Sequence, residues 1–205
     1  MPTPSVVVFD LGKVLVDFDY SIAARRLAAE ADLSPGGVQQ FLNQSSLLHR
    51  FETGLITRHE FFAEIREGTG YRGTPSTFAA VFADIFTEIT AMTALHAEIR
   101  QRGIPTYILS NTNDLAIDHI RQRFPFFALF DGYVLSYEVG AMKPAPKIYA
   151  ALEEMSGRRG QEIFYLDDRQ ENVDAGAVRG WQVVRQTDAE LSRSALVQAG
   201  ILSAL

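Results

Sequence analysis

Short apolar runs end at polar residues at five places along the chain. The first run spans residues 6–9, is rich in valine and stops at Asp10. Similar runs occupy residues 105–109, 132–135, 163–166 and 182–184. Short β-branched runs without polar alternation are typical of buried strands in a parallel sheet. We therefore predict five parallel strands at these positions.

Amphipathic stretches with helical periodicity separate most of these runs. They cover residues 93–102, 115–123, 145–155, 172–178 and 189–199. Strands that alternate with helices predict an α/β fold, a doubly wound parallel sheet with helices on both faces. Ligands bind such sheets beyond the carboxyl ends of the strands. The polar residues that follow each apolar run are therefore candidates for a functional site.

One long segment breaks this alternation. Between about residues 20 and 89 the pattern is helical throughout, with candidate helices at 22–31, 58–66 and 78–89. Breaks are expected at 35–37, 54 and 68–73, where glycine and proline gather. This pattern predicts a small helical lobe inserted after the first strand, over the carboxyl ends of the sheet. We expect residues 1–17 and 93–205 to form the α/β core and residues 18–92 to form the lobe.

Composition narrows the classes of function. The formal net charge is −6, which disfavours a nucleic-acid partner because such proteins usually present a basic face. The chain has no cysteine, which excludes disulfides, thiolate metal sites and a cysteine nucleophile. No stretch is long and apolar enough to span a bilayer, and the start lacks the basic and small-residue features of a signal peptide. We expect a cytoplasmic protein without membrane or nucleic-acid partners; the sequence leaves the oligomeric state open.

Acidic residues follow two of the predicted strands. Asp10 ends the first strand and is followed by a turn with Gly12, while Asp167 and Asp168 follow the fourth. A carboxylate at a strand end can act as a nucleophile or a metal ligand, although a single aspartate there is often only a turn residue. Two adjacent carboxylates repel unless a cation is near, and oxygen ligands of this kind suit Mg²⁺. The alternative for the pair is a turn that caps the next helix.

Two further motifs lie at strand ends or before a helix. Ser110 and Asn111 follow the second strand, where hydroxyl, amide and backbone N–H groups can hold phosphate oxygens or cap a helix. Lys143 precedes Pro144 and a predicted helix, where it could neutralise a carboxylate and a phosphate together. A solvated loop lysine is the usual alternative. The chain has only three lysines, however, and two of them lie in candidate motifs: Lys143 here and Lys13 after Asp10.

The order of the motifs carries more information than any one of them. An aspartate, a serine–asparagine pair, a lysine–proline pair and an aspartate pair follow one another, and this order resembles the haloacid dehalogenase-like hydrolase superfamily. The resemblance covers nearly the whole chain, and the helical lobe looks like the small cap of the first subclass of that superfamily. Residues 9–17, 109–113 and 164–168 most resemble the bacterial α-D-glucose-1-phosphate phosphatases. The phosphatase lobe of soluble epoxide hydrolases is similar, but more distantly.

This resemblance implies a Rossmann-like core and a magnesium site. Asp10 would be the nucleophile and a metal ligand, and the carbonyl of Gly12 would be a second ligand. Asp168 would bind Mg²⁺ directly, whereas Asp167 would support it, for example through water.

The resemblance also implies how the phosphoryl group is held. Ser110 and Asn111 would bind it, and Lys143 would stabilise both Asp10 and the charge of the transition state. The substrate would be a small phosphorylated metabolite.

The chain departs from the pattern of most phosphatases in this superfamily at Gly12. Most carry there a second aspartate that acts as general acid and base. Haloacid dehalogenases also lack it, but they need no metal and lack the late acidic pair. Phosphonoacetaldehyde hydrolases use a cap lysine instead, and residues 18–92 contain no lysine. These comparisons favour a phosphatase.

We therefore predict a magnesium-dependent phosphatase that hydrolyses a small phosphate monoester through an aspartyl phosphate. The substrate is expected to be a sugar phosphate such as glucose 1-phosphate. A phosphatase for a nucleotide remains an alternative, as does a weakly active domain that binds a ligand or a protein.

Without an acid at Gly12, esters with acidic leaving groups should react faster, because general acid catalysis is typically worth about 10² to 10⁴ in rate. Sugar 1-phosphates and aryl phosphates should then outpace sugar 6-phosphates, unless Asp17 or Asp19 supplies the proton. Four residues of the lobe could contact the substrate or simply form a solvated helix face: His49, Arg50, Glu52 and Arg58.

Overall fold

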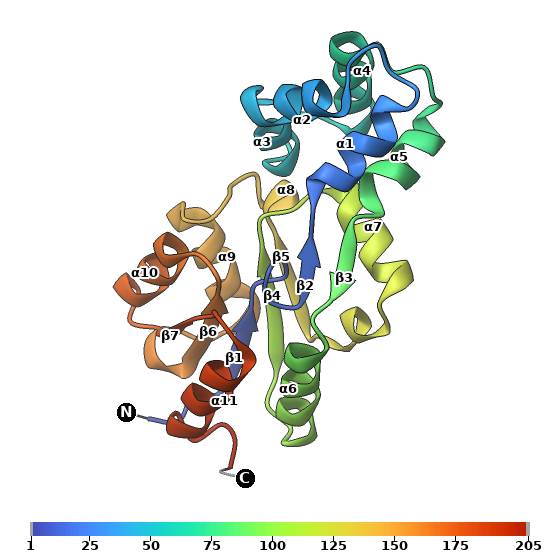
Figure 1. Ribbon diagram of the computed structural model, residues 1–205. Helices are drawn as coiled ribbons and strands as arrows, with labels where there is room; N and C mark the ends of the chain where they lie inside the picture. The colour runs from blue at the N-terminus through green and yellow to red at the C-terminus, as the bar shows by residue number, and fades with distance from the viewer. Residues whose placement is uncertain (1, 204–205) are drawn as a thin grey trace.

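The computed structural model describes residues 2–203 and contains a five-stranded parallel sheet (Figure 1). Its strands are β1 (Val6–Phe9), β4 (Thr106–Ser110), β5 (Gly132–Leu135), β6 (Ile163–Asp167) and β7 (Gln182–Arg185). They lie in the order β5-β4-β1-β6-β7. Every predicted strand agrees with an observed one to within one residue at each end, and the predicted α/β fold is confirmed.

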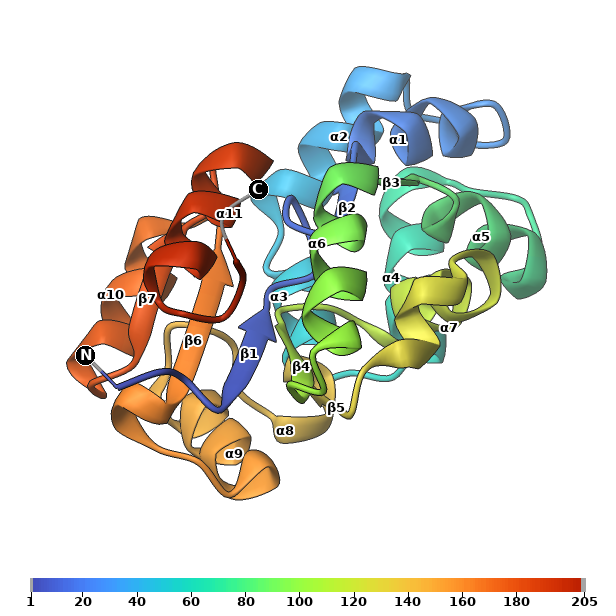
Figure 2. The ribbon, with the colours of Figure 1, turned by 90° about the horizontal axis from the view of Figure 1, so that it is seen from below.

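The strands read as unbroken apolar runs because both faces of the sheet are covered. Val7 and Phe9 belong to a cluster formed with α6 (Thr90–Gln101), α7 (Asp114–Arg123) and α11 (Ala189–Gln198). Val6 and Val8 point the other way, to α9 (Pro146–Ser156) and α10 (Gln170–Val178). Figure 2 shows α6 and α11 on one side of the sheet and α9 on the other. Alternate residues of one strand therefore serve two separate cores.

The central position of β1 determines where the site can form. Phe9 pairs with Ile108 of β4 on one side and with Leu166 of β6 on the other. The residues just beyond these three therefore meet at one edge of the sheet. The motifs at Asp10, Ser110 and Asp167 are brought together in this way, although more than 150 residues of sequence separate the first from the last.

Five helices form a lobe beyond that edge (Figure 1). They are α1 (Tyr20–Ala28), α2 (Pro35–Gln44), α3 (Leu47–Glu52), α4 (Arg58–Thr69) and α5 (Pro75–Ala83). Their apolar faces share a cluster of their own, with stacked and edge-to-face rings of Phe51, Phe61, Phe78 and Phe82 at its centre. Among residues 2–203, no helix combines the length and apolar character needed to cross a membrane.

A two-stranded antiparallel ribbon joins the lobe to the sheet. It consists of β2 (Val16–Phe18) and β3 (Phe86–Glu88). The sequence prediction of a helix over 78–89 is wrong for its last residues, because Phe86 pairs with Phe18 across the ribbon. The two strands lie far apart in sequence, and local periodicity carries no signal of such pairing.

The expected break at residues 35–37 is also wrong. This segment is the first turn of α2, where the Ser34 hydroxyl accepts a hydrogen bond from the Gly37 N–H. Pro35 stands at the first helical position, where a missing N–H costs nothing. The remaining elements are short: α8 (Ser136–Val139) and the 3₁₀ turns Pro125–Leu129 and Gly160–Glu162.

Candidate active site

A tight turn after β1 holds Asp10 at the bottom of a cavity. The Leu11 N–H donates to Asp10 Oδ1 over 2.7 Å, and the Lys13 N–H donates to the Val16 carbonyl over 2.7 Å. Lys13 has φ of 59°, the left-handed region, which closes the turn within a few residues. Asp10 lines the cavity and is 7 % exposed. The turn therefore presents one carboxylate to a ligand while burying most of its surface.

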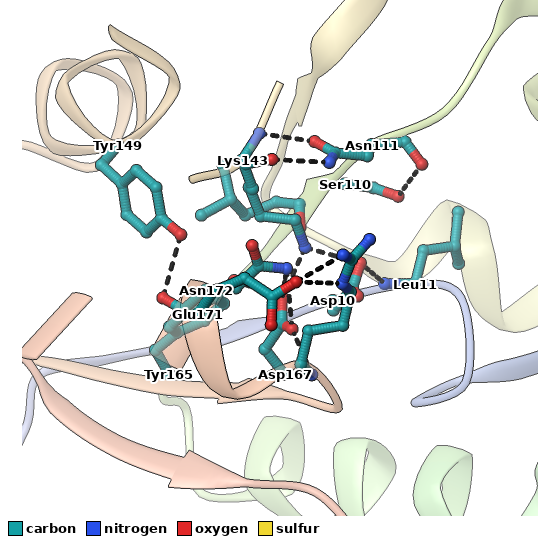
Figure 3. A network of polar contacts seen from close by, with 12 residues as sticks. Asp10, Leu11, Ser110, Asn111, Lys143, Tyr149, Tyr165, Asp167, Glu171 and Asn172 are labelled. Atoms are coloured by element: carbon teal, nitrogen blue, oxygen red, sulfur yellow. Dashed lines mark hydrogen bonds and ion pairs between the residues drawn. The ribbon is translucent and has the colours of Figure 1, made fainter. Parts of the chain in front are cut away.

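Lys143 is the buried cation of the site (Figure 3). Its Nζ lies 2.9 Å from Asp10 Oδ1 and 2.6 Å from Asp167 Oδ2, and it donates to the Leu109 carbonyl over 2.8 Å. Burial opposes its charge, but the two carboxylates outweigh burial and raise the pKa of Lys143. The lysine is therefore a fixed positive charge between two strand ends, as its sequence position suggested.

The side chain of Asn111 holds the Lys143 loop in place. Asn111 Nδ2 donates to the Lys143 carbonyl over 3.0 Å, and the Lys143 N–H donates to Asn111 Oδ1 over 2.7 Å. Both ends of the amide are thus engaged with backbone, so the amide positions the lysine, and Asn111 also lines the cavity. The Ser110 hydroxyl makes a long 3.4 Å contact with the Asn111 carbonyl and lines the cavity, where it can turn to a ligand.

Asp167 is fully buried and saturated with donors (Figure 3). Arg169 N–H donates to Oδ1 over 2.9 Å, Asn172 Nδ2 reaches both oxygens, and the Tyr165 hydroxyl and Lys143 meet Oδ2. Burial alone would raise the pKa of Asp167, but Lys143 and these donors lower it below its usual value. Asp167 is therefore a fixed negative charge that supports the site rather than an open ligand.

The carboxylates at this edge form a group that fits a hard cation. One oxygen from each of Asp10, Asp167 and Asp168 lies within 4.8 Å of the others. Burial raises the pKa of Asp10 to about 7 against the pull of Lys143, and burial together with the charge of Asp167 raises the pKa of Asp168. Crowded carboxylates with raised pKa values call for a cation, and carboxylate and carbonyl oxygens suit Mg²⁺. Asp10, Asp168 and the carbonyl of Gly12 would hold the ion.

The lobe supplies the roof of this cavity of about 230 Å³. Phe18, Tyr20, Leu48 and Glu52 line it from the lobe and its connecting ribbon, opposite the residues of the core. Tyr20 and Leu48 were not anticipated from the sequence, because an aromatic or leucine on an amphipathic helix usually belongs to a core.

Of the four candidate contacts in the lobe, only Glu52 lines the cavity. Arg50 pairs with Glu64 over 2.8 Å within the lobe. Arg58 reaches out of the lobe to Asp114 and Asp118 of α7, at 2.6 and 2.7 Å. His49 is exposed. Arg58 therefore ties the lobe to the core, and Glu52 alone of the four faces a ligand.

Comparisons with known proteins show what this chain resembles. The sequence pattern of the haloacid dehalogenase-like hydrolases matches residues 4–180. A D-ribitol-5-phosphate phosphatase of Bacteroides thetaiotaomicron is 24% identical over 186 residues, which cover 86% of this chain and 88% of the relative. A sesquiterpene phosphatase of Aspergillus oryzae is 24% identical over 91% of this chain and 92% of its own length.

Solved structures share the fold. A haloacid dehalogenase family enzyme from Bacteroides thetaiotaomicron, in complex with magnesium and inorganic phosphate, matches with a TM-score of 0.77 and 26% identity. The match covers 90% of this chain and 94% of that enzyme. An L-2-haloacid dehalogenase from Xanthobacter autotrophicus shares the fold at 21% identity and a TM-score of 0.63. Because the family pattern spans most of its length, the chain belongs to the haloacid dehalogenase-like hydrolases.

Proposed function

We propose that this hydrolase is a magnesium-dependent phosphatase that acts on a small phosphate monoester through an aspartyl phosphate. The observation that carries the proposal is Asp10, held 2.9 Å from the buried ammonium of Lys143 at the bottom of a cavity that Asp168 also lines. The two curated relatives described above are named as phosphatases, and the enzyme from Bacteroides thetaiotaomicron binds magnesium with phosphate. Both facts support the assignment.

The reaction follows from the positions of the charged groups. A carboxylate oxygen of Asp10 attacks phosphorus, and the bond from phosphorus to the leaving oxygen breaks. Water then attacks the aspartyl phosphate, which releases inorganic phosphate and restores Asp10. Lys143 and the hydroxyl of Ser110 are placed to stabilise charge on the phosphoryl oxygens. Bound Mg²⁺ would help to neutralise the negative charge of the same oxygens.

We propose a sugar phosphate, such as glucose 1-phosphate, as the substrate. The roof of the cavity offers the carboxyl of Glu52 and the hydroxyl of Tyr20, which can hydrogen-bond to substrate hydroxyl groups. Leu48 and Phe18 can pack against an apolar sugar face. The relative that acts on D-ribitol 5-phosphate supports a hydroxylated substrate, and a nucleotide remains the second candidate.

We also propose that the lobe opens and closes over the cavity as a cap, with residues 1–17 and 93–205 as the core. The chain passes between the core and the lobe twice, once through β2 and once through β3. Met92 belongs to α6 and packs in the cluster of the core. The boundary between lobe and core that was predicted after residue 92 is therefore better placed a few residues earlier. Cap closure would exclude water from the aspartyl phosphate.

A first assay decides between an enzyme and a binding module. Hydrolysis of 4-nitrophenyl phosphate is measured with Mg²⁺, with a chelator, and in the Asp10→Asn variant. The proposal requires turnover that needs both the metal and Asp10. Equal rates with and without metal would refute it. A panel of glucose 1-phosphate, D-ribitol 5-phosphate and adenosine monophosphate then ranks the substrate classes by kcat/KM.

A further inference from the structure

The space beside Gly12 is filled by an aromatic ring. A Cβ built on Gly12 would lie 2.8 Å from Cε1 of Phe18, the last residue of β2. A carboxylic acid at this position would require the Phe18 ring to move. The turn after the nucleophile is therefore packed for glycine, and the proton for the leaving group must come from elsewhere.

The two acidic residues downstream in the same segment are committed to other contacts. Asp17 pairs with Lys13 and accepts a hydrogen bond from the Phe18 N–H. Asp19 caps α1 by accepting from the N–H and hydroxyl of Ser21. Neither of them lines the cavity, which three other carboxyl-bearing residues do. Asp10 and Asp168 are already assigned to nucleophile and metal, which leaves Glu52.

Glu52 has the environment of a proton donor. It ends α3 and lines the same cavity as Asp10, and the Tyr20 hydroxyl lies 3.4 Å from its Oε1. Burial raises the pKa of Glu52 to about 7, although the hydrogen bond from Tyr20 opposes the shift. A carboxyl with a pKa near neutrality can carry a proton to the leaving oxygen and regain it from water.

The backbone of Glu52 is fixed to the core beside the phosphate loop. The hydroxyl of Ser136, which is buried, donates to the Glu52 carbonyl and accepts from the Thr112 N–H over 2.9 Å. Thr112 follows directly on Ser110 and Asn111. A single buried hydroxyl therefore links the end of α3 to the loop that faces the phosphoryl group.

We propose that Glu52 is the general acid of this enzyme, supplied by the cap in place of the residue missing at position 12. As the bond from phosphorus to the leaving oxygen breaks, the proton of the Glu52 carboxyl passes to that oxygen and the product departs as a neutral alcohol. The resulting carboxylate takes a proton from the water that attacks the aspartyl phosphate. This inference rests on the proposed phosphatase activity.

The test compares leaving groups of different acidity in Glu52→Gln, which keeps the shape and removes the acid. The substrates are 4-nitrophenyl phosphate, whose leaving group needs little protonation, and the best primary-alcohol phosphate in a panel of sugar and polyol phosphates. We expect kcat/KM, which reports the steps up to loss of the leaving group, to fall by about 10² to 10⁴ for the alcohol phosphate and by less than about tenfold for the aryl ester. The later hydrolysis of the aspartyl phosphate is common to both substrates and affects only kcat. The exposed Glu67 on α4 gives a matched control, and Glu67→Gln should behave as wild type on both.

Each other outcome has a distinct meaning. Equal losses of kcat/KM on both substrates would overturn the acid role and indicate a structural one, and circular dichroism and thermal unfolding would reveal any folding defect. A rise in KM with unchanged kcat would also overturn it, because Glu52 would then only bind a substrate hydroxyl. Wild-type turnover of the aryl ester alone would show that no acid operates. If wild type hydrolyses neither ester, the phosphatase proposal itself fails.

Discussion

Gly54 packs closely against the core, and its replacement tests whether that approach matters for catalysis. A Cβ on Gly54 would lie 2.2 Å from the carbonyl oxygen of Tyr137, where real contacts essentially never fall below 3.0 Å. The alanine variant must therefore push α3 away from the core. Glu52 is two residues from Gly54, so Glu52 would move together with α3, away from the Ser136 hydroxyl that donates to its carbonyl.

Two consequences of Gly54→Ala have known magnitudes: the cost of the backbone conformation and the displacement of a catalytic group. Gly54 has φ of +72°, and a residue with a Cβ in this left-handed region costs about 1–2 kcal/mol. A displacement of about 1 Å at a catalytic group can lower the rate by about 10²-fold. We expect Gly54→Ala to lower kcat/KM for the best sugar phosphate by about this factor, measured as phosphate release under steady-state conditions.

Gly157 provides a control that separates the two consequences. It ends α9 with φ of +65°, and a Cβ there meets nothing within 4 Å. Gly157→Ala should therefore show only the cost of the left-handed conformation. We expect its Tm to fall by about 2–8 °C for a chain of this size, with kcat/KM unchanged. If both variants keep wild-type kcat/KM, the close packing of cap on core is not needed for turnover and the reasoning is wrong.

Three further substitutions test the remaining roles. Asp10→Asn should fold with an unchanged circular dichroism spectrum and lose turnover, because an amide is a poor nucleophile of the same shape; near-normal activity would exclude Asp10 as nucleophile. Asp168→Ala should raise the Mg²⁺ concentration needed for half-maximal activity more than Asp167→Asn, because Asp167 has its oxygens occupied by protein donors; the reverse order would reassign the ligand. Asn111→Ala should lower kcat more than it raises KM for phosphate esters, since it releases the Lys143 loop; a pure KM effect in steady-state kinetics would point to direct phosphate binding.

Most of the α/β core was readable from the sequence because its strands are buried on both faces. Residues 6–9 of β1 and 163–166 of β6 are apolar without interruption, and an acidic residue of the site follows each run. Helical periodicity placed the flanking helices for the same reason. Such local patterns follow directly from burial, and they need no knowledge of distant contacts.

The parts that were missed depend on contacts between distant segments. The pairing of Phe86 with Phe18 and the link from Ser136 to Glu52 join residues more than 60 positions apart. Tyr165 and Asn172 were missed as partners of Asp167, although both lie within five residues of it. Their spacing, two residues before and five after the aspartate, fits an ordinary strand and helix equally well, so only the fold reveals that they meet.

The site draws its groups from the core and from the lobe. Lys143, which we propose to meet the phosphoryl group, comes from the core, where it is buried and bound to Asp167, so its geometry is fixed before any substrate arrives. The proton donor that we propose, Glu52, comes from the cap. The bonds from Ser136 to Glu52 and from Arg58 to α7 form only when the cap lies on the core. Closure and the arrival of the acid would then be one event, so that an open enzyme could bind an ester without cleaving it.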